Sequence, residues 1–405
     1  MSNNIVIVGA GQAGVAVAFK LRSYGHTGLI TLVEAESVLP YHRPPLSKRF
    51  ITDRLDAERM YIKQAALYEQ SNIAFVKGCT AVSINPGIKC VDLSNGQSVA
   101  YDVLVLATGS RARNLPDPDQ PPARNVRTLR TLDDAQWLRE AFLPGARLLV
   151  IGGGYIGLES AAVARSLGMN VTLIERDPRI LGRVASAETA AYFRALHQAH
   201  GVTVHEGVNL TRFEYAGERV TAVELSDGSR LAVDVVIVGI GVAPNTDLAA
   251  HAGLHIENGI AVDRSCRTSD ASIYALGDCA SFPSEGRMIR LESVQNAVDM
   301  AEVVACAITG DPKEYVPVPW FWSDQYATKL QIAGLNTGYT RTVVRENHAG
   351  SLSIWYFAGD RLVAVDAIND ARAFMTAKRL LAQCRSPNSD MVRDTSIELN
   401  ALSPV

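Results

Sequence analysis

The chain has 405 residues, which at roughly 150 residues per domain predicts two or three domains. Its net charge of −3 lacks the surplus of Lys and Arg that nucleic-acid binding requires, so nucleic acid is excluded as the main partner. Apolar residues make up 47% and charged residues 20%, a balance that excludes a largely disordered chain. No apolar run approaches the roughly 20 residues that cross a bilayer, and no secretory signal is visible, so we expect a cytoplasmic protein without a membrane partner.

A βαβ unit opens the chain. The continuous apolar run 5–8 is typical of a parallel strand covered on both faces. It is followed by three spaced glycines, a helical stretch over 15–23 and a second strand over 29–33 that ends in an acid; these residues are Gly9, Gly11, Gly14 and Glu34. In this pattern the first glycine makes a tight turn, the second lets a pyrophosphate approach the backbone, and the third allows close helix–strand packing. The helix N-terminus then faces the phosphates, and the acid accepts hydrogen bonds from ribose hydroxyls.

The same pattern returns 143 residues later, with a strand over 148–151, a helix over 158–167 and a strand over 170–174. Its glycines and acid are Gly152, Gly154, Gly157 and Glu175. Two such units predict two dinucleotides, and the usual pair is a bound flavin and an exchangeable nicotinamide. A carboxylate at this strand end favours a free 2′-hydroxyl, so we expect NADH in preference to NADPH, although Arg176, Arg179 and Arg183 could partly offset this.

Further strands close each unit. The run 103–106 leads into Ala107, Thr108 and Gly109, the run 235–238 leads into Gly239, Ile240 and Gly241, and the run 272–276 leads into Gly277 and Asp278. An Asp at the last of these strand ends can bond a ribityl hydroxyl, which only a flavin nucleotide has; a helix N-cap is the alternative. We therefore place FAD on the first unit and the nicotinamide nucleotide on the second.

The expected fold is α/β, with two Rossmann-like dinucleotide-binding domains, the second inserted in the first, and a C-terminal α+β interface domain. Linkers are expected at the Pro-rich 115–122 and at 243–245. The predicted boundaries are 1–113 and 246–317 for the FAD-binding domain, 114–245 for the NAD-binding domain and 318–405 for the C-terminal domain. In the last, we expect strands over 328–333, 351–357 and 361–367, a turn at 359–360, a helix over 370–383 and little order from Ser386 onward.

The six cysteines are widely spaced and form no metal-binding or C-x-x-C pattern, so we expect no metal site. We expect them to be buried small hydrophobic residues.

The order of these motifs resembles the two-dinucleotide-domain flavoproteins of the glutathione reductase fold. Within that group, Arg-Pro-Pro-Leu-Ser-Lys at 43–48 and Phe-Trp-Ser-Asp-Gln-Tyr at 321–326 resemble the FAD-dependent NADH:ferredoxin reductases of bacterial oxygenase and cytochrome P450 systems, of the putidaredoxin reductase type. The resemblance covers about residues 4–384.

This resemblance implies two sets of binding residues. The FAD set is Gly9, Gly11, Ala13, Gly14, Glu34, Ala35, Arg43, Lys48, Val82, Ala107, Thr108, Gly109, Arg130, Asp278, Val294 and Trp322. The NAD set is Gly152, Gly154, Tyr155, Ile156, Gly157, Glu175, Gly241 and Glu292, with Tyr155 covering the flavin before NADH enters.

The resemblance also implies a catalytic pair, in which Lys48 lies beside flavin N5 and pairs with Glu159. An ammonium there stabilises the negative charge of a reduced flavin. A solvated loop lysine and an ordinary helical glutamate are the alternatives.

Disulfide reductases of this fold carry a redox cysteine after the first nucleotide strand, but residues 38–46 contain none. Electrons must then leave to an external acceptor, and ferredoxins are usually acidic. On the expected last helix, Ala373, Phe374, Ala377, Leu380 and Leu381 form an apolar stripe. Basic residues lie on the complementary side and either dock the acceptor or are merely solvated: Arg372, Lys378, Arg379 and Arg385.

The sequence thus predicts an NADH-dependent ferredoxin reductase with FAD that reduces a [2Fe-2S] ferredoxin serving a cytochrome P450 or other oxygenase. A rubredoxin or monodehydroascorbate-type reductase is the enzyme alternative. An NADH-sensing interaction protein resembling apoptosis-inducing factor is the alternative of another class. The oligomeric state stays open.

Overall fold

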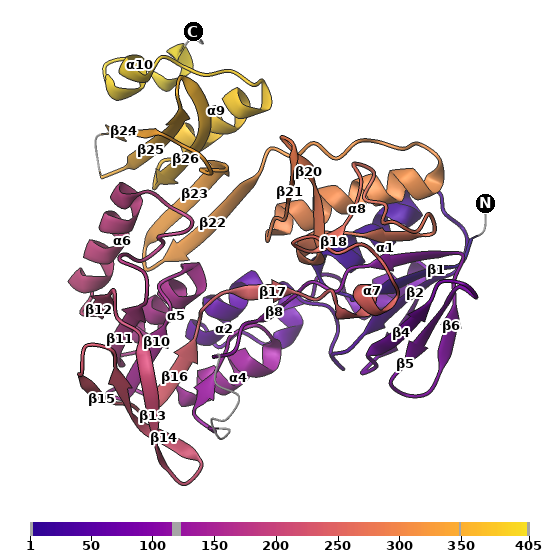
Figure 1. The fold of residues 1–405 in the computed structure, drawn as a ribbon, viewed down its shortest axis with the longest axis horizontal. Helices are drawn as coiled ribbons and strands as arrows, with labels where there is room; N and C mark the ends of the chain where they lie inside the picture. Colours follow the sequence, from indigo (N-terminus) through magenta and orange to yellow (C-terminus); the bar gives the residue numbers. More distant parts are fainter. Residues whose placement is uncertain (1–2, 116–122, 348–349, 403–405) are drawn as a thin grey trace. The chain divides into compact units, whose positions relative to one another are not determined.

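The computed structural model describes residues 3–115, 123–347 and 350–402 (Figure 1). The chain divides into two compact units. Unit 1 comprises Met1–His42, Asp56–Arg111 and Val242–Pro317, and unit 2 comprises Arg43–Leu55, Ala112–Gly241 and Val318–Val405. The short segment Arg43–Leu55 thus belongs to the same unit as the second nucleotide motif and the C-terminal sheet. The linker predicted at 115–122 lies almost wholly outside the described residues.

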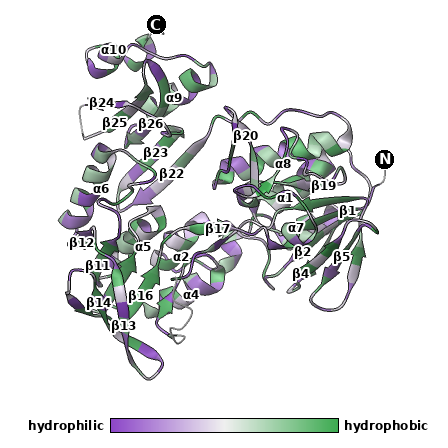
Figure 2. Ribbon diagram, viewed as in Figure 1, coloured by the Kyte–Doolittle hydropathy of each residue, from purple (hydrophilic) through white to green (hydrophobic). Residues whose placement is uncertain are grey.

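A parallel five-stranded sheet forms the centre of unit 1, in the order β19-β7-β1-β2-β3. Its strands are β1 Ile5–Val8, β2 Ile30–Glu34, β3 Ile73–Lys77, β7 Val103–Leu106 and β19 Ile273–Ala275. Ile5 is paired with Ile30 on one side and Val103 on the other, and every residue of β1 is buried. A strand covered on both faces needs no polar alternation, which explains its continuous apolar run (Figure 2).

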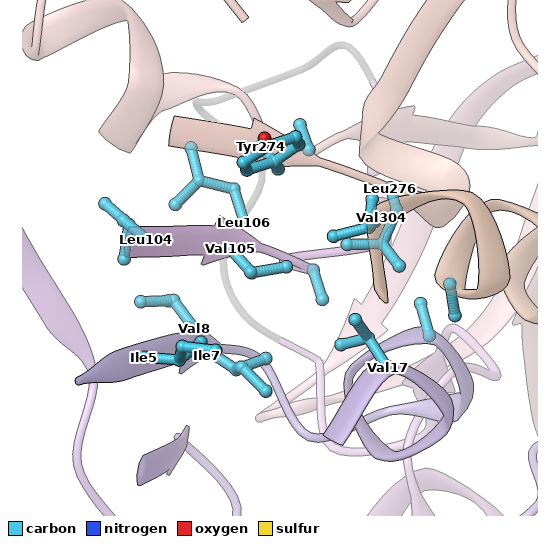
Figure 3. Close-up of a cluster of buried hydrophobic side chains, with 14 of the residues drawn as sticks. Ile5, Ile7, Val8, Val17, Leu104, Val105, Leu106, Tyr274, Leu276 and Val304 are labelled. Atoms are coloured by element: carbon cyan, nitrogen blue, oxygen red, sulfur yellow. The ribbon is translucent and has the colours of Figure 1, made fainter. Parts of the chain in front are cut away.

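Two helices of unit 1, α1 Gln12–Ser23 and α8 Val294–Thr309, pack against each other. Val17 of α1 and Val304 of α8 lie with Ile7, Leu106 and Leu276 in one apolar cluster (Figure 3). The smaller elements are α3 Ala65–Gln70, α7 Asp247–His251, and the 3₁₀ turns η2 Ala57–Met60 and η3 Gly277–Cys279. Two three-stranded sheets complete the unit, one of β4 Ala81–Asn85, β5 Cys90–Leu93 and β6 Ser98–Ala100, the other of β18 Ile260–Ala261, β20 Ala280–Ser284 and β21 Arg287–Ile289. β8 Ser110–Ala112 pairs with β17 Val242–Pro244, so the expected linker at 243–245 is largely a strand.

Unit 2 repeats the topology of the first sheet, in the order β12-β11-β10-β16-β9. Its strands are β9 Val126–Arg127, β10 Arg147–Ile151, β11 Asn170–Glu175, β12 Thr203–Glu206 and β16 Val235–Val238. Its helices are α2 Arg49–Thr52, α4 Leu132–Ala141, α5 Tyr155–Ser166 and α6 Ala187–Ala199, with the 3₁₀ turn η1 Pro44–Ser47. A small antiparallel sheet contains β13 Leu210–Ala216, β14 Arg219–Leu225 and β15 Arg230–Ala232. The repeat inferred from the glycine motifs is therefore a repeat of whole sheets.

An antiparallel sheet from the C-terminal part of the chain completes unit 2, in the order β22-β23-β26-β25-β24. Its strands are β22 Trp320–Gln325, β23 Thr328–Gly334, β24 Arg341–Glu346, β25 Leu352–Ala358 and β26 Arg361–Ile368. Helix α9 Ala371–Ala382 packs on β23 and β26, and Asp370 caps it by accepting a hydrogen bond from Ala373 N at 2.9 Å. The three predicted strands, the turn at 359–360 and the helix are confirmed, whereas β22 and β24 were not predicted. The predicted fold class is confirmed.

The expectation of little order from Ser386 onward is wrong. Helix α10 Ser389–Arg393 and the 3₁₀ turn η4 Leu399–Ala401 lie there, and Val392, Leu399 and Leu402 join the apolar core beneath α9. The buried Arg345 of β24 donates hydrogen bonds to the carbonyl oxygens of Val392, Asp394 and Ile397 at 2.8–3.0 Å. The Arg345 guanidinium therefore holds the segment that contains residues 392–397. The apolar residues of this segment are too few to show a helical or strand periodicity in the sequence.

Among the described residues, no helix combines the length and the apolar character that a bilayer span requires.

Candidate functional site

The first glycine turn, in unit 1, leaves a helix N-terminus open. Gly11 is the N-cap of α1 and supplies no capping side chain. A Cβ at Gly14 would lie 1.9 Å from Gly9 O, so only glycine allows this approach of helix to strand. A Cβ at Gly11, in contrast, would meet no described atom within 4 Å. The space beside Gly11 is therefore available to a ligand.

The second turn, in unit 2, has the same geometry. Gly154 is the N-cap of α5 without a capping side chain, and a Cβ there would also meet no described atom within 4 Å. A Cβ at Gly157 would lie 2.1 Å from Gly152 O. The other described helices of ten or more residues are all capped by a side chain, namely those of Thr131, Ser186, Ser293 and Asp370. The two open N-termini are those whose N–H groups would bind phosphates, so the residues present fit a dinucleotide in each unit.

The two carboxylates at the ends of the second strands, Glu34 in unit 1 and Glu175 in unit 2, have equivalent hydrogen bonds. Glu34 accepts hydrogen bonds from Ala10 N at 2.7 Å and from Glu36 N at 3.1 Å. Glu175 accepts them from Gly153 N at 2.7 Å and from Asp177 N at 2.8 Å. Each carboxylate is thus fixed beside its glycine turn, and its remaining lone pairs can accept bonds from ribose hydroxyls.

Asp278 lies in η3, where the chain leaves β19 near the start of α1. A Cβ at the preceding Gly277 would lie 3.0 Å from Ala13 Cβ, which shows how closely this turn approaches the first glycine motif. Asp278 Oδ2 accepts a hydrogen bond from Ser110 Oγ at 2.8 Å. Arg290 Nη1 donates to the backbone oxygen of Asp278 at 3.3 Å and lies 2.5 Å from Glu292 Oε1, so one guanidinium contacts both residues. Asp278 lies inside η3, whose N-cap is Leu276, so it is not the N-cap of that turn.

The other residues of the FAD set in unit 1 are spread over four elements. Ala35 directly follows β2, Ala107, Thr108 and Gly109 follow β7, Val294 begins α8, and Val82 lies on β4 with 53% of its side chain exposed. The assignment of these residues, and of all site residues, stays a prediction.

A buried ion pair in unit 2 joins the two predicted catalytic residues. Lys48 Nζ lies 2.6 Å from Glu159 Oε2, with 17% of the lysine and 2% of the glutamate side chain exposed. Ser47 Oγ donates to the same oxygen at 2.5 Å, and Ser323 Oγ donates to Glu159 Oε1 at 2.6 Å. The second turn of α5 and the residue directly after η1 thus bring together side chains that are 111 positions apart in the sequence. The solvated-lysine alternative is wrong.

Unit 2 also contains further residues of the two predicted binding sets. Arg43 Nη1 donates to Arg130 O at 2.7 Å, which ties the start of η1 to the segment before α4. The Tyr155 ring packs on Phe321 with 5.0 Å between centroids, and Trp322 packs on Trp320 at 5.7 Å. Ile156 is 44% exposed, and a Cβ at Gly241 would lie 3.6 Å from Arg183 Nη2.

The cysteines do not support thiolate chemistry. Burial raises the pKa of Cys266 and Cys279, so these thiols stay neutral. The Cys279 thiol, next to Asp278, donates to Leu276 O at 3.4 Å. The expectation that all six are buried is wrong: Cys79 and Cys90 are half-buried and Cys384 is exposed, because they lie at the margins of their elements.

Four members of the predicted apolar stripe of α9 are buried, namely Ala373, Phe374, Ala377 and Leu380, and Leu381 is half-buried against the same core. Arg372, Arg379 and Arg385 are exposed, which fits both a docking surface and a merely solvated face, so their docking role stays a prediction. Lys378 differs from these three arginines because it is half-buried, with its ammonium 4.8 Å from the centre of the Trp320 ring. It is a packing residue as well as a charge.

A second buried polar cluster connects α6 with the C-terminal sheet. Thr189 Oγ1 donates to Asp366 Oδ2 at 2.7 Å, and the Tyr356 hydroxyl donates to the same oxygen. Burial, and then the charges of Asp366 and Tyr356, raise the pKa of Tyr155. Burial raises the pKa of Asp366 to about 6.

Because Asp366 binds its proton more tightly in the folded than in the unfolded chain, its contribution to stability is fully present below pH 4 and is lost as the pH rises through 6. An asparagine does not titrate, so we expect Asp366→Asn to remove this loss. The difference in the free energy of unfolding, variant minus natural chain, should therefore rise by about 2–3 kcal/mol from pH 4 to pH 7. Urea denaturation across that range measures the difference, with the exposed Asp390→Asn as control. A difference that is independent of pH would contradict the expectation.

Comparison with known proteins agrees with this geometry. Residues 3–301 match the family described as pyridine nucleotide-disulphide oxidoreductase, and residues 320–403 match the one described as reductase C-terminal. Putidaredoxin reductase of Pseudomonas putida is 41% identical over 99% of this chain and 97% of its own length. Rubredoxin-NAD(+) reductase of Pseudomonas putida is 40% identical over 90% and 95%. The solved covalent putidaredoxin reductase–putidaredoxin complex contains a chain that superposes with a TM-score of 0.96 at 42% identity, covering 99% of this chain and 98% of that one. The resemblance inferred from residues 43–48 and 321–326 is confirmed.

Proposed function

Because the chain belongs to the pyridine nucleotide-disulphide oxidoreductase family, we propose that it is an NADH-dependent FAD enzyme that reduces a [2Fe-2S] ferredoxin serving a cytochrome P450 or other oxygenase. The full-length likeness to putidaredoxin reductase carries the proposal. It is supported by the two open helix N-termini and by residues 38–46, which contain no cysteine. We place this reaction in the cytoplasm.

In this proposal, residues 1–113 and 246–317 bind FAD and residues 114–245 bind NADH, while residues 318–405 meet the ferredoxin. Bound FAD supplies the chemistry that takes a hydride from NADH and releases electrons singly. The first glycine turn holds the FAD pyrophosphate, Glu34 its ribose and Asp278 its ribityl chain.

On the nicotinamide side, the Glu175 carboxylate selects against a 2′-phosphate, because the two charges repel each other. Two of the three neighbouring arginines make contacts of their own. Arg179 donates to Ala185 O at 2.8 Å, and Arg176 lies 3.6 Å from Asp177 Oδ1.

At the reacting centre, Lys48 places a positive charge where the flavin gains negative charge. Glu159 fixes that ammonium by an ion pair in a site from which water is largely excluded. Cys279, which follows Asp278, and Cys266 are buried and neutral, so neither supplies a thiolate for disulfide exchange.

Cytochrome c reduction by the purified chain with FAD and NADH tests the proposal, with putidaredoxin or a rubredoxin as carrier. We expect the [2Fe-2S] carrier to give the higher kcat/KM, and NADPH to give a lower value than NADH. A higher kcat/KM with rubredoxin would instead favour a rubredoxin reductase, which the likeness to rubredoxin-NAD(+) reductase makes the second candidate. A chain that binds no FAD would overturn both.

A further inference from the structure

A chain of buried hydrogen bonds continues from Glu159 into the C-terminal sheet and on to α6. Ser323 Oγ donates to Glu159 Oε1 at 2.6 Å, and Gln325 Nε2 donates to Ser323 Oγ at 3.2 Å. Gln325 Oε1 lies 2.8 Å from His197 Nε2, and the Tyr326 hydroxyl lies 3.3 Å from His197 Nδ1. Five side chains from α5, β22, its following turn and α6 are thus connected, although they are up to 167 positions apart in the sequence.

The bonds of this chain all point in one direction. Glu159 accepts from Ser323, so the Ser323 oxygen accepts from the Gln325 amide, and the Gln325 carbonyl oxygen is left to accept from His197. His197 must therefore carry its proton on Nε2, and its Nδ1 accepts from the Tyr326 hydroxyl. Burial lowers the pKa of His197 to about 4, which keeps the ring neutral at pH 7 and allows this assignment.

The far end of the chain fixes the imidazole ring. Tyr326 lies in the turn after β22 with a positive φ of 54°, and its ring stacks on His200 with 3.7 Å between centroids. Because both nitrogens of His197 are bonded, one to Tyr326 and the other to Gln325, the imidazole has little freedom to turn.

The burial of these groups makes the arrangement costly to break. Ser323, Gln325 and His197 are 0% exposed, and Glu159 is 2% exposed. A buried polar group that loses its partner costs about 1–3 kcal/mol, and more if it is charged. Because successive donors polarise one another, the last bond, from Ser323 to the carboxylate, is strengthened by those behind it.

We propose that Ser323, Gln325 and His197 are positioning residues that hold the Glu159 carboxylate with one oxygen directed at Lys48. Ser323 occupies Oε1, which leaves Oε2 for Lys48 and Ser47. The C-terminal sheet thereby sets the position of the lysine at the flavin. This consequence rests on the proposed function, whereas the hydrogen-bond chain itself does not.

The direction of the chain is tested without turnover, by ¹⁵N NMR of histidine-labelled holoprotein at pH 7. His197 is assigned by comparison with His197→Gln. We expect the Nε2–H form in the natural chain, and a loss of this preference in Gln325→Leu, which keeps the side-chain volume but removes both hydrogen bonds. An Nδ1–H form in the natural chain would overturn the proposal, whatever the outcome of the carrier assay.

The effect on Lys48 is tested by stopped-flow reduction of the bound flavin by NADH, without any carrier. We expect Ser323→Ala to lower the limiting rate about tenfold and Gln325→Leu about threefold, with the Kd for NADH unchanged. Ser323→Thr keeps the hydroxyl and should restore most of the rate. Ser353→Ala removes another buried hydroxyl of the C-terminal sheet, which accepts a hydrogen bond from Trp355 Nε1 at 3.1 Å, and should leave the rate unchanged. Equal rates in Ser323→Ala, Gln325→Leu and Ser353→Ala, all folded by thermal melting, would overturn the proposal.

Discussion

Replacing Lys48 by Met should slow the reduction of the bound flavin by NADH about 10²–10³-fold, the usual effect of losing one preorganised group that stabilises developing charge. The Lys48 side chain is 17% exposed and its ammonium is held at 2.6 Å from a buried carboxylate, so its position is already set before NADH arrives. Methionine is similar in length to the apolar methylene stem of lysine but lacks the charged ammonium. Stopped-flow absorbance at the flavin band measures the rate directly.

The neighbouring Arg49 provides the control for this variant. Its side chain is 74% exposed and pairs with Asp53 on the surface, so Arg49→Met removes one cation from the same segment without touching the pair. We expect a rate within about twofold of the natural chain. A similar rate in Lys48→Met would show that the lysine is not at the reacting centre.

Glu159→Gln provides the second half of a double-mutant cycle. Because the glutamate acts through the lysine, its loss should matter much less when Lys48 is already Met, and the two effects should not be additive. Additive effects would mean that the 2.6 Å contact has no part in the reaction.

The glycine turns and the buried strands could be predicted from the sequence because each depends on local chemistry. Ile5–Val8 and Val235–Val238 have the predicted bounds, since a strand covered on both faces is a simple apolar run. The helices begin three residues earlier than predicted, at Gln12 and Tyr155, because the glycine motif itself forms their first turn. Propensity alone does not place glycines in a helix.

What could not be predicted depends on contacts between distant segments. β22 was missed because its burial does not follow a simple alternation, and its aromatic residues fit a loop or a core equally well. Ser323, Gln325 and His197 give no local signal of a shared network, since Gln325 and His197 are 128 positions apart. The pairing of Lys48 with Glu159 was implied only by resemblance, because 111 positions separate the two residues.

Docking of the ferredoxin should depend on the exposed face of α9. Arg372, Met375 and Arg379 recur at intervals of three and four residues, so they share one side of the helix, opposite the buried Phe374 and Ala377. Met375 is 61% exposed between the two arginines. An apolar centre with basic residues beside it suits an acidic electron carrier.

We expect Arg372→Glu combined with Arg379→Glu to raise the KM for a [2Fe-2S] ferredoxin about tenfold or more at low ionic strength, because two attractive charges become repulsive. The effect should shrink at about 1 M salt, where the screening length is about 3 Å. Ferricyanide reduction should be unchanged, since it needs no docking surface. Lys378 is left intact because its replacement would also disturb the packing of Trp320.

Lys329→Glu combined with Arg393→Glu is the matched control, because both residues are exposed, lie in the same C-terminal part of unit 2 and produce the same change in net charge. If the face of α9 is the docking surface, this control should change the KM much less than the α9 variant. An equal rise in the KM of both variants would mean that net charge alone steers the ferredoxin. Long-range attraction depends on the summed field of the protein, whereas docking depends on which side chains meet the partner.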